Sequence, residues 1–262
     1  MNRLDEFATA WAHHPHVVKQ ANWIPKFPVW PTQFLKRISK TLSADWLRVS
    51  HRGRFLNHME LQDHEHSIGR DGIRRVSAER LDHFLCDGAT VVFRSVDSYH
   101  EPCFQLVETL SARFNCRVAC NFYAAKSMSK GFGAHFDSHH IFVVQAFGQK
   151  TWQVEARPNT LVKTSGDVKN QISPLPENSS VSTFHLTAGD VLYVPKGARH
   201  SANAEADGSC HFSFGIHIPT GIDAYDKSRA DFENSIEGLA ETVNFYGDSL
   251  KANQMARALH RT

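Results

Sequence analysis

Three residues in this sequence have the types and spacing of a metal-binding triad. His135 and Asp137 are separated by one residue and lie just before a run of alternating apolar and polar residues. On a β-strand, residues i and i+2 point to the same face, so these two side chains can converge on one ion. His200 ends the segment GDVLYVPKGARH, which predicts a strand, a turn with proline and glycine, and the start of another strand.

Two imidazoles and one carboxylate form a facial triad that suits Fe(II) and leaves coordination positions open for other ligands. The separation of 65 residues between His135 and His200 fits ligands on opposing strands of a jelly roll. The chain has 17 histidines, so a His-x-Asp pair alone is a weak signal. Its combination with the GDVLYVPKGARH segment predicts an iron site formed by His135, Asp137 and His200.

The remaining histidines give weaker signals. His64 and His66 flank Glu65 and resemble a metal-binding pair, but no third ligand stands at a suitable spacing, so we interpret them as part of a solvated loop. His211 and His217 are interpreted as core or pocket-wall residues rather than ligands.

Short β-prone runs dominate the chain from Cys116 to Pro219. Because they are separated by turn residues and not by helices, they predict a sandwich or barrel and not a parallel α/β sheet. Gly148-Gln149 and Ala188-Gly189-Asp190 are predicted to be tight connections. The predicted strands are 117–124, 139–147, 150–155, 182–186, 191–194 and 211–218.

The flanking segments predict helices around this core. The expected elements are a short helix over 4–11, an extended proline-rich path over 22–34, a helix over 77–85 capped by Ser77, a strand over 89–94 and a helix over 101–114. In the last of these, Phe104, Val107, Leu110 and Phe114 are expected to share one apolar side. We predict an N-terminal segment (1–88), a catalytic core (89–219) that includes a long polar loop over 163–180, and a C-terminal helical segment (220–262).

The C-terminal segment carries an apolar stripe of heptad type. Its members recur at alternating spacings of four and three, which favours packing onto the barrel and leaves a helix pair that joins two subunits as the alternative. The stripe consists of Phe232, Ile236, Leu239, Val243, Tyr246 and Leu250.

The composition is that of an ordinary soluble protein. Hydrophobic residues make up 41% and charged residues 21%, and the formal net charge of +2 is too small to imply nucleic-acid or membrane binding by itself. The five cysteines form no Cys-x-x-Cys pair, which favours free thiols in a reducing compartment. The sequence shows no signal-peptide pattern and no apolar stretch of membrane-spanning length, so a cytoplasmic location is expected.

Several blocks of the sequence resemble the cupin-like JmjC oxygenases, in particular the ribosomal-oxygenase branch that hydroxylates protein side chains. The blocks occur in the family's order and spacing and cover about 200 residues. They are FATAWAHHPHVV (7–18), NFY (121–123), GFGAHFD (131–137), FVVQAFGQKTW (142–152), GDVLYVPKGARH (189–200) and SCHFSFG (209–215).

The resemblance implies a mainly β fold with flanking helices (α+β), with a double-stranded β-helix (jelly-roll, cupin) core. It also implies Fe(II) as cofactor, 2-oxoglutarate as co-substrate and O2 as oxidant. Lys150 matches the family's basic partner for the distal carboxylate of 2-oxoglutarate. Tyr123 and Asn121 match positions that line the co-substrate pocket, and Ser213 is a weaker candidate there.

The prime substrate is less defined. His139 and His140 stand where the family commonly carries acidic residues, and His140 is a weak candidate for substrate contact. A side chain in a protein or peptide is the favoured target of hydroxylation. The family's usual winged-helix region has no counterpart after Pro219, so a free amino acid or natural-product intermediate stays open. A cupin metalloprotein that does not use 2-oxoglutarate and a non-catalytic binding module are the remaining alternatives, and demethylation is ranked below hydroxylation.

Overall fold

The structure is a computed structural model of the chain. It divides into two compact units, Met1–Ile218 and Pro219–Thr262, and the second lies almost wholly outside the described residues, as do the predicted C-terminal stripe and most of the 163–180 loop. No helix in the described part of the chain is long and apolar enough to cross a bilayer. The described residues are 4–41, 43–52, 54–56, 58–61, 76–126, 131–157, 175, 180–219 and 228.

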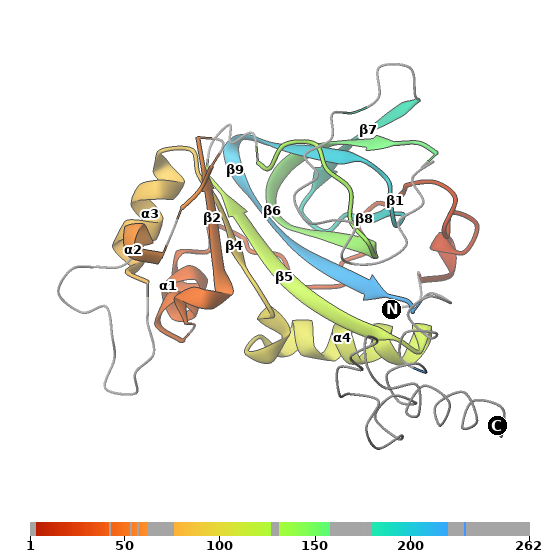
Figure 1. The fold of residues 1–262 in the computed structure, drawn as a ribbon, viewed down its shortest axis with the longest axis horizontal. Coiled ribbons are helices and arrows are strands. Elements are labelled where there is room, and N and C mark those ends of the chain that lie inside the picture. The colour runs from red at the N-terminus through yellow and green to blue at the C-terminus, as the bar shows by residue number, and fades with distance from the viewer. Residues whose placement is uncertain are drawn as a thin grey trace, which may run out of the picture. The chain divides into compact units, whose positions relative to one another are not determined.

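The described residues are built around one antiparallel sheet of nine strands (Figure 1). Its order is β1-β8-β6-β9-β5-β4-β2-β3, with β7 paired to β6, and the β6 to β9 part bends into the double-stranded β-helix that the sequence predicts. The strands are β1 (His16–Val18), β2 (Leu47–His51), β3 (Arg54–Phe55), β4 (Thr90–Phe93), β5 (Arg117–Ala125), β6 (His140–Glu155), β7 (Val181–Thr187), β8 (Val191–Val194) and β9 (His200–His217).

β6 is one continuous strand, so the predicted break into two strands at Gly148-Gln149 is wrong. The pairing of β6 with β9 shifts register between Gln145 and Phe147 and again between Gly148 and Lys150. Gly148 has φ +63, a left-handed conformation that glycine adopts at no steric cost. The glycine therefore produces a bulge that bends the strand round the barrel instead of a turn that ends it.

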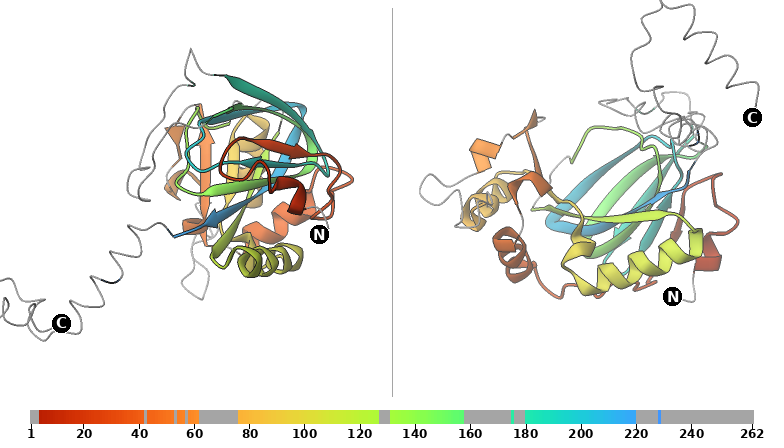
Figure 2. Two further views of the ribbon diagram at one scale, coloured as in Figure 1. Left: turned by 90° about the vertical axis from the view of Figure 1, so that its right-hand side faces the viewer. Right: turned by 60° about the horizontal axis from the view of Figure 1, so that its bottom comes forward.

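Within the described ranges, four α-helices flank the sheet: α1 (Thr32–Thr41), α2 (His58–Leu61), α3 (Ala78–Cys86) and α4 (Glu101–Phe114). Ser77 caps α3 as predicted, accepting a hydrogen bond from the Arg80 backbone N–H. In both views of Figure 2, α4 lies against one face of the sheet. Its bounds match the prediction, but Phe104 is 47% exposed instead of buried. The buried stripe starts at Cys103, and Phe104 is rotated about 100° away from it.

The strand β5 separates the hydrophobic core from the interior of the barrel. Val118, Cys120, Phe122 and Ala124 are buried on the side that packs against helices, with the Phe122 ring 4.9 Å from that of Phe34 in α1. The alternate residues face the barrel interior because successive strand side chains point to opposite faces. This alternation places Asn121 and Tyr123 on the interior side.

The N-terminal segment is part of the sheet and not a separate layer. The expected helix over 4–11 is reduced to a 3-10 turn at Leu4–Phe7, and β1 then pairs with β8. β2 and β3 join the opposite end of the sheet. The predicted domain division at residue 88 stays a prediction, although the first 88 residues contribute three strands to the barrel sheet.

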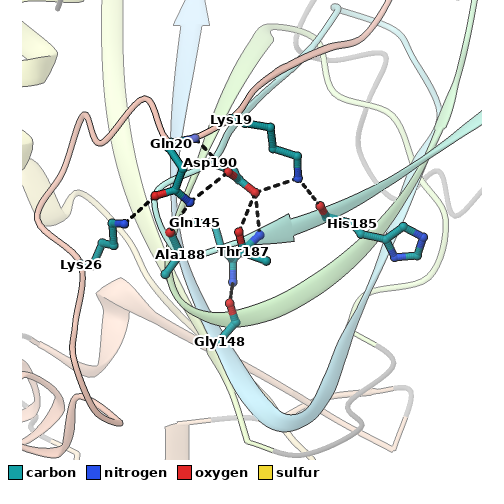
Figure 3. A network of polar contacts seen from close by, with 9 residues as sticks. All are labelled: Lys19, Gln20, Lys26, Gln145, Gly148, His185, Thr187, Ala188 and Asp190. Atoms are coloured by element: carbon teal, nitrogen blue, oxygen red, sulfur yellow. Dashed lines mark hydrogen bonds and ion pairs between the residues drawn. The ribbon is translucent and has the colours of Figure 1, made fainter.

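A buried carboxylate fastens this N-terminal segment to the barrel (Figure 3). Asp190 lies in the turn before β8 and is fully buried. It accepts hydrogen bonds from the Lys19 ammonium (2.9 Å), the Gln20 backbone N–H (3.0 Å), and the backbone N–H (2.8 Å) and hydroxyl (2.9 Å) of Thr187. Although burial alone raises it, these bonds hold the pKa of Asp190 below its ordinary value.

Replacing Asp190 with alanine is expected to lower the free energy of unfolding by about 2–4 kcal/mol, because several buried donors lose their acceptor. Urea titration of the purified chain measures this change. The control is Asp87→Ala at an exposed ion pair, which should leave the unfolding midpoint nearly unchanged. Equal midpoints for the two variants would show that the Asp190 network does not stabilise the fold.

Candidate metal and co-substrate site

His135, Asp137 and His200 lie together at one end of the barrel. One ligand atom from each of the three lies within 4.8 Å of the other two, and His200 Nε2 is 3.6 Å from Asp137 Oδ2. The two histidines are held opposite each other by a pair of backbone hydrogen bonds, His135 N–H to His200 O (3.0 Å) and His200 N–H to His135 O (2.7 Å). The main chain therefore fixes the spacing of the triad independently of any ion.

Both imidazoles are oriented by a backbone carbonyl. His135 Nδ1 lies 2.9 Å from Gly133 O, and His200 Nδ1 lies 2.9 Å from Ala198 O. Because a carbonyl oxygen can only accept, each Nδ1 must carry the hydrogen, which leaves the Nε2 lone pair free for a metal. This is the outer hydrogen bond that metal-ligating histidines usually make.

The charges of the triad also suit a cation. Burial lowers the pKa of His200 to about 4, with the nearby His135 adding to the effect, so His200 is neutral at physiological pH. Burial raises the pKa of Asp137, but His200, His139 and His135 outweigh it and keep that pKa below its ordinary value. Asp137 is therefore ionised beside the neutral His200 imidazole, which is the protonation state that a divalent metal needs in these two ligands.

The turn between β8 and β9 holds the third ligand in register with the first two. The Gly197 N–H donates to Asp137 O (2.9 Å), which ties the turn to the irregular segment before β6 that carries the carboxylate. At the far side of the turn, the Glu155 N–H donates to Arg199 O (2.8 Å), and the Arg199 guanidinium lies 3.4 Å from the buried Glu155 carboxylate. These bonds start β9 with His200 directed at His135.

A cavity beside the triad contains most of the predicted co-substrate residues. Lys150, Tyr123 and Ser213 line it together with the triad. The other lining residues are Thr90, Gly131, Phe132, Ile141, Trp152, Ala202 and His211.

Lys150 is a buried cation at this cavity. Its side chain is 4% exposed, and no carboxylate of the described residues lies within ion-pair distance of its ammonium. Burial lowers the pKa of Lys150 to about 8. A buried ammonium without a counter-ion is costly, so the cavity is built to receive an anion.

Two further polar groups in the cavity wall lack a hydrogen-bond partner. Trp152 Nε1 and His211 Nδ1 are both buried and unpaired among the described residues. The Tyr123 ring stacks on His211 with centroids 4.6 Å apart and planes 9° apart. Burial raises the pKa of Tyr123, so its hydroxyl stays protonated and can donate. Together with Lys150, these groups offer a set of donors to a small anionic ligand.

Asn121 and His140 are not among the residues that line the cavity. Asn121 Oδ1 accepts from the Ser95 N–H (3.2 Å), and the Asn121 side chain hydrogen-bonds Tyr123. Asn121 therefore supports the tyrosine and does not itself line the cavity. His140 is buried elsewhere, with Nδ1 2.9 Å from the Tyr193 hydroxyl and its ring stacked on Trp11. The structure therefore gives no support to substrate contact by His140. His64, Glu65 and His66 lie outside the described residues.

Trp152 and His211 are cavity residues that the sequence interpretation did not assign to the co-substrate. Each had a signal, because Trp152 is two residues from Lys150 and His211 is two residues from Ser213, which places each pair on one face of a strand. Phe132 had no such signal, since it lies in an irregular glycine-rich segment.

The family comparison agrees with this geometry. A protein-family model described as a JmjC domain matches residues 98–224. A Drosophila mojavensis protein described as bifunctional lysine-specific demethylase and histidyl-hydroxylase NO66 is 26% identical over 194 residues, 71% of this chain and 21% of the relative. A protein of the same description from Dictyostelium discoideum is 26% identical over 130 residues, 46% of this chain and 24% of the relative. The chain thus spans under a quarter of the length of these relatives.

Solved structures show the same fold. The ribosomal oxygenase YcfD from Escherichia coli superposes with a TM-score of 0.59 at 17% identity, over 98% of this chain and 64% of that chain. A structure of YcfD in complex with cobalt and 2-oxoglutarate also gives a TM-score of 0.59 at 17% identity, over 100% of this chain and 66% of that chain. Over residues 98–224 the chain is similar to JmjC domains, and its described strands in that range form a double-stranded β-helix.

Proposed function

We propose that this protein is an Fe(II)- and 2-oxoglutarate-dependent oxygenase that hydroxylates an amino-acid side chain in a protein or peptide. The observation that carries the proposal is the buried ammonium of Lys150, which has no ion-pair partner in the described part of the chain and lies in the cavity that the triad also lines. A metal site alone fits many cupin proteins, whereas a metal site with a buried cation beside it fits a metal-chelating dicarboxylate. The names of the sequence relatives, which include histidyl-hydroxylase, support a polypeptide substrate.

The donor set fits the two groups. His135, Asp137 and His200 would hold iron through two Nε2 atoms and one carboxylate, the facial arrangement of non-haem iron oxygenases. Lys150 and the Tyr123 hydroxyl would bind the distal carboxylate of 2-oxoglutarate by charge-assisted hydrogen bonds. Bound iron and 2-oxoglutarate activate dioxygen for C–H hydroxylation while 2-oxoglutarate is decarboxylated to succinate.

The chain's own residues position these groups and exclude water. Gly133 O and Ala198 O hold the imidazoles in the metal-binding tautomer. The His211 ring packs against Tyr123 and lies edge-on to Trp152, with centroids 5.5 Å apart, which orients the Tyr123 hydroxyl and closes the cavity wall. Phe132, whose centroid is 6.2 Å from that of Tyr123, covers part of the cavity from the side of β3.

The affinity for 2-oxoglutarate is expected to fall about tenfold for each pH unit above pH 8. The bound dicarboxylate needs the Lys150 ammonium, and in the ligand-free protein burial lowers the pKa of that lysine to about 8. Above this pH a proton must be taken up on binding, so each further unit weakens binding tenfold. Calorimetric titration of the Mn(II)-loaded protein from pH 7 to 9.5 measures this slope, and a flat profile would show that Lys150 does not titrate with binding.

The proposed function is tested by incubating the protein with Fe(II), 2-oxoglutarate and panels of ribosomal proteins, synthetic peptides and free amino acids. Succinate release should rise in the presence of a polypeptide substrate, which should gain the mass of one oxygen atom. Stimulation by a free amino acid alone would transfer the assignment to a small-molecule hydroxylase. Release of formaldehyde with loss of a methyl group would identify a demethylase.

A further inference from the structure

Positive charge gathers at the two sides of the candidate site. On the first side, the pairing of β2 with β4 and of β4 with β5 places Arg48 opposite Val92 and Val92 opposite Tyr123. Directly paired residues share a face of the sheet, so Arg48 lies on the barrel-interior face, about 10 Å across two strands from Tyr123. Arg48 is exposed, and its charge acts on the Tyr123 hydroxyl.

The second side is formed around His139, two residues beyond the ligand Asp137. The His139 ring lies 4.4 Å from that of His217, and His217 pairs with Arg117 across β5 and β9. The charges of Lys196 and Arg117 both act on His139. Arg117 is exposed and Lys196 is half-buried, so both are accessible to a ligand beside the metal site.

These three cations are not matched by carboxylates. Among the described residues no acidic side chain lies within ion-pair distance of Arg48, Arg117 or Lys196, and Asp137 is the one carboxylate among the residues that line the cavity. Several other cations are paired with carboxylates, such as Arg52 with Asp87, Arg54 with Glu60 and Lys126 with Asp82.

The excess positive charge would remain when Fe(II) and 2-oxoglutarate are bound. The two charges of Fe(II) offset the two of 2-oxoglutarate, and Asp137 offsets Lys150. Arg48, Arg117 and Lys196 are then three positive charges at the two sides of the site that have no ion-pair partner among the described residues. Like charges at such a rim oppose a basic substrate and favour an acidic one.

We propose that the substrate is an acidic polypeptide segment whose carboxylates bind Arg48 on one side of the target residue and Arg117 and Lys196 on the other. The inference rests on the proposed function and names the substrate class of that same site. Arg117 and Tyr123 are six residues apart on β5, which is about 20 Å. An extended peptide covers this distance in roughly six residues, so the carboxylates are expected about three residues before and three residues after the target.

A polypeptide fits these cations better than a nucleic acid does. Arginine binds a carboxylate through two parallel hydrogen bonds, and isolated cations on opposite sides of a site match isolated acidic side chains. A nucleic-acid backbone presents a charge at every nucleotide and is usually met by a continuous basic stripe, which a chain of formal net charge +2 with two separate basic positions does not provide.

The test compares fluorescent nine-residue peptides that share a randomised central residue and carry Glu, Gln or Lys three positions before and after it. Binding to the full chain loaded with Mn(II) and 2-oxoglutarate is followed by anisotropy, and succinate release with Fe(II) is followed separately. The Glu peptides are expected to bind about tenfold more tightly than the Gln peptides at low salt, with the difference shrinking as salt rises.

Arg48→Gln and Arg117→Gln should each reduce the preference for Glu severalfold, whereas the matched control Arg52→Gln, at an arginine that already has a partner, should not. Equal or tighter binding of the Lys peptides would overturn the proposal, as would tighter binding of a single-stranded oligouridylate than of the Glu peptides. A Glu preference that depends on Arg48, together with no succinate release, would support the acidic-segment surface and contradict the proposed oxygenase function.

Discussion

Replacing Lys150 with methionine is expected to weaken 2-oxoglutarate binding roughly 100-fold while iron binding is retained. The ammonium is the one cation among the residues that line the cavity, and a dicarboxylate left without it would be buried with an uncompensated charge. Loss of one partner of a buried, hydrogen-bonded charge pair costs about 3 kcal/mol, which corresponds to a roughly 100-fold weaker affinity. Calorimetric titration of the Mn(II)-loaded variant with 2-oxoglutarate measures the change.

The same substitution should leave the fold intact. Methionine keeps most of the volume of lysine and removes a charge whose burial is unfavourable, so the unfolding temperature without ligand should stay level or rise. Lys126→Met, at a partly exposed lysine paired with Asp82, is the matched control and should bind 2-oxoglutarate normally. Wild-type affinity in Lys150→Met would instead favour a cupin metalloprotein that does not use 2-oxoglutarate.

Replacing Asp137 with asparagine should eliminate turnover and weaken iron binding. The loss of affinity should exceed the roughly 10- to 100-fold loss that follows substitution of residues that only hydrogen-bond to metal ligands. The change keeps the shape of the side chain but removes the one negative charge of the triad, which would attract the metal cation. Anaerobic equilibrium dialysis against Fe(II) measures the affinity.

Asp87→Asn is the control for this substitution, because Asp87 is an exposed carboxylate paired with Arg52 and His51. It should bind iron like the wild type. Normal iron content together with normal turnover in Asp137→Asn would show that the triad is not the metal site. Retained iron binding with lost turnover would instead limit Asp137 to a role in the reaction.

The metal triad could be predicted because its determinants are local. His135 and Asp137 are separated by one residue, and the proline- and glycine-containing turn before His200 has a strong sequence signal. The expected strand alternation is not what brings them together, because His135 forms an isolated bridge with His200 and Asp137 lies outside any strand. The bounds of α4 and β8 were predicted for the same reason, since the amphipathic pattern of the helix and the short β-prone run of the strand are both short-range features. Lys150 depended on the family resemblance, and the structure places it at the cavity.

The elements that were missed depend on partners far away in the sequence. β1 has three residues, and it is a strand because β8, more than 170 residues later, pairs with it. The same contact region contains the Asp190 network, which no short-range pattern reveals. The helix α1 carries Phe34, Leu35 and Ile38 on one buried side, but the prolines just before it favoured an extended interpretation.

The position of Asn121 shows a different limit. Strand alternation correctly placed it on the face of Tyr123, yet its side chain is used to hold Ser95 and the tyrosine. His140 was predicted from its distance to the ligands, whereas the direction of its side chain is set by Tyr193 and Trp11, which come from distant segments. Tertiary packing decides which neighbour forms a hydrogen bond with a polar side chain, and the sequence pattern does not reveal that neighbour.

The most direct test of the oxygenase assignment is to supply the wild-type protein with Fe(II), 2-oxoglutarate and ¹⁸O₂ and to weigh the succinate that it releases. Oxidative decarboxylation places one atom of dioxygen in the new carboxylate, so the account predicts singly labelled succinate from the wild type and none from Asp137→Asn or Lys150→Met. Iron-loaded wild-type protein that binds 2-oxoglutarate but forms no labelled succinate would contradict it.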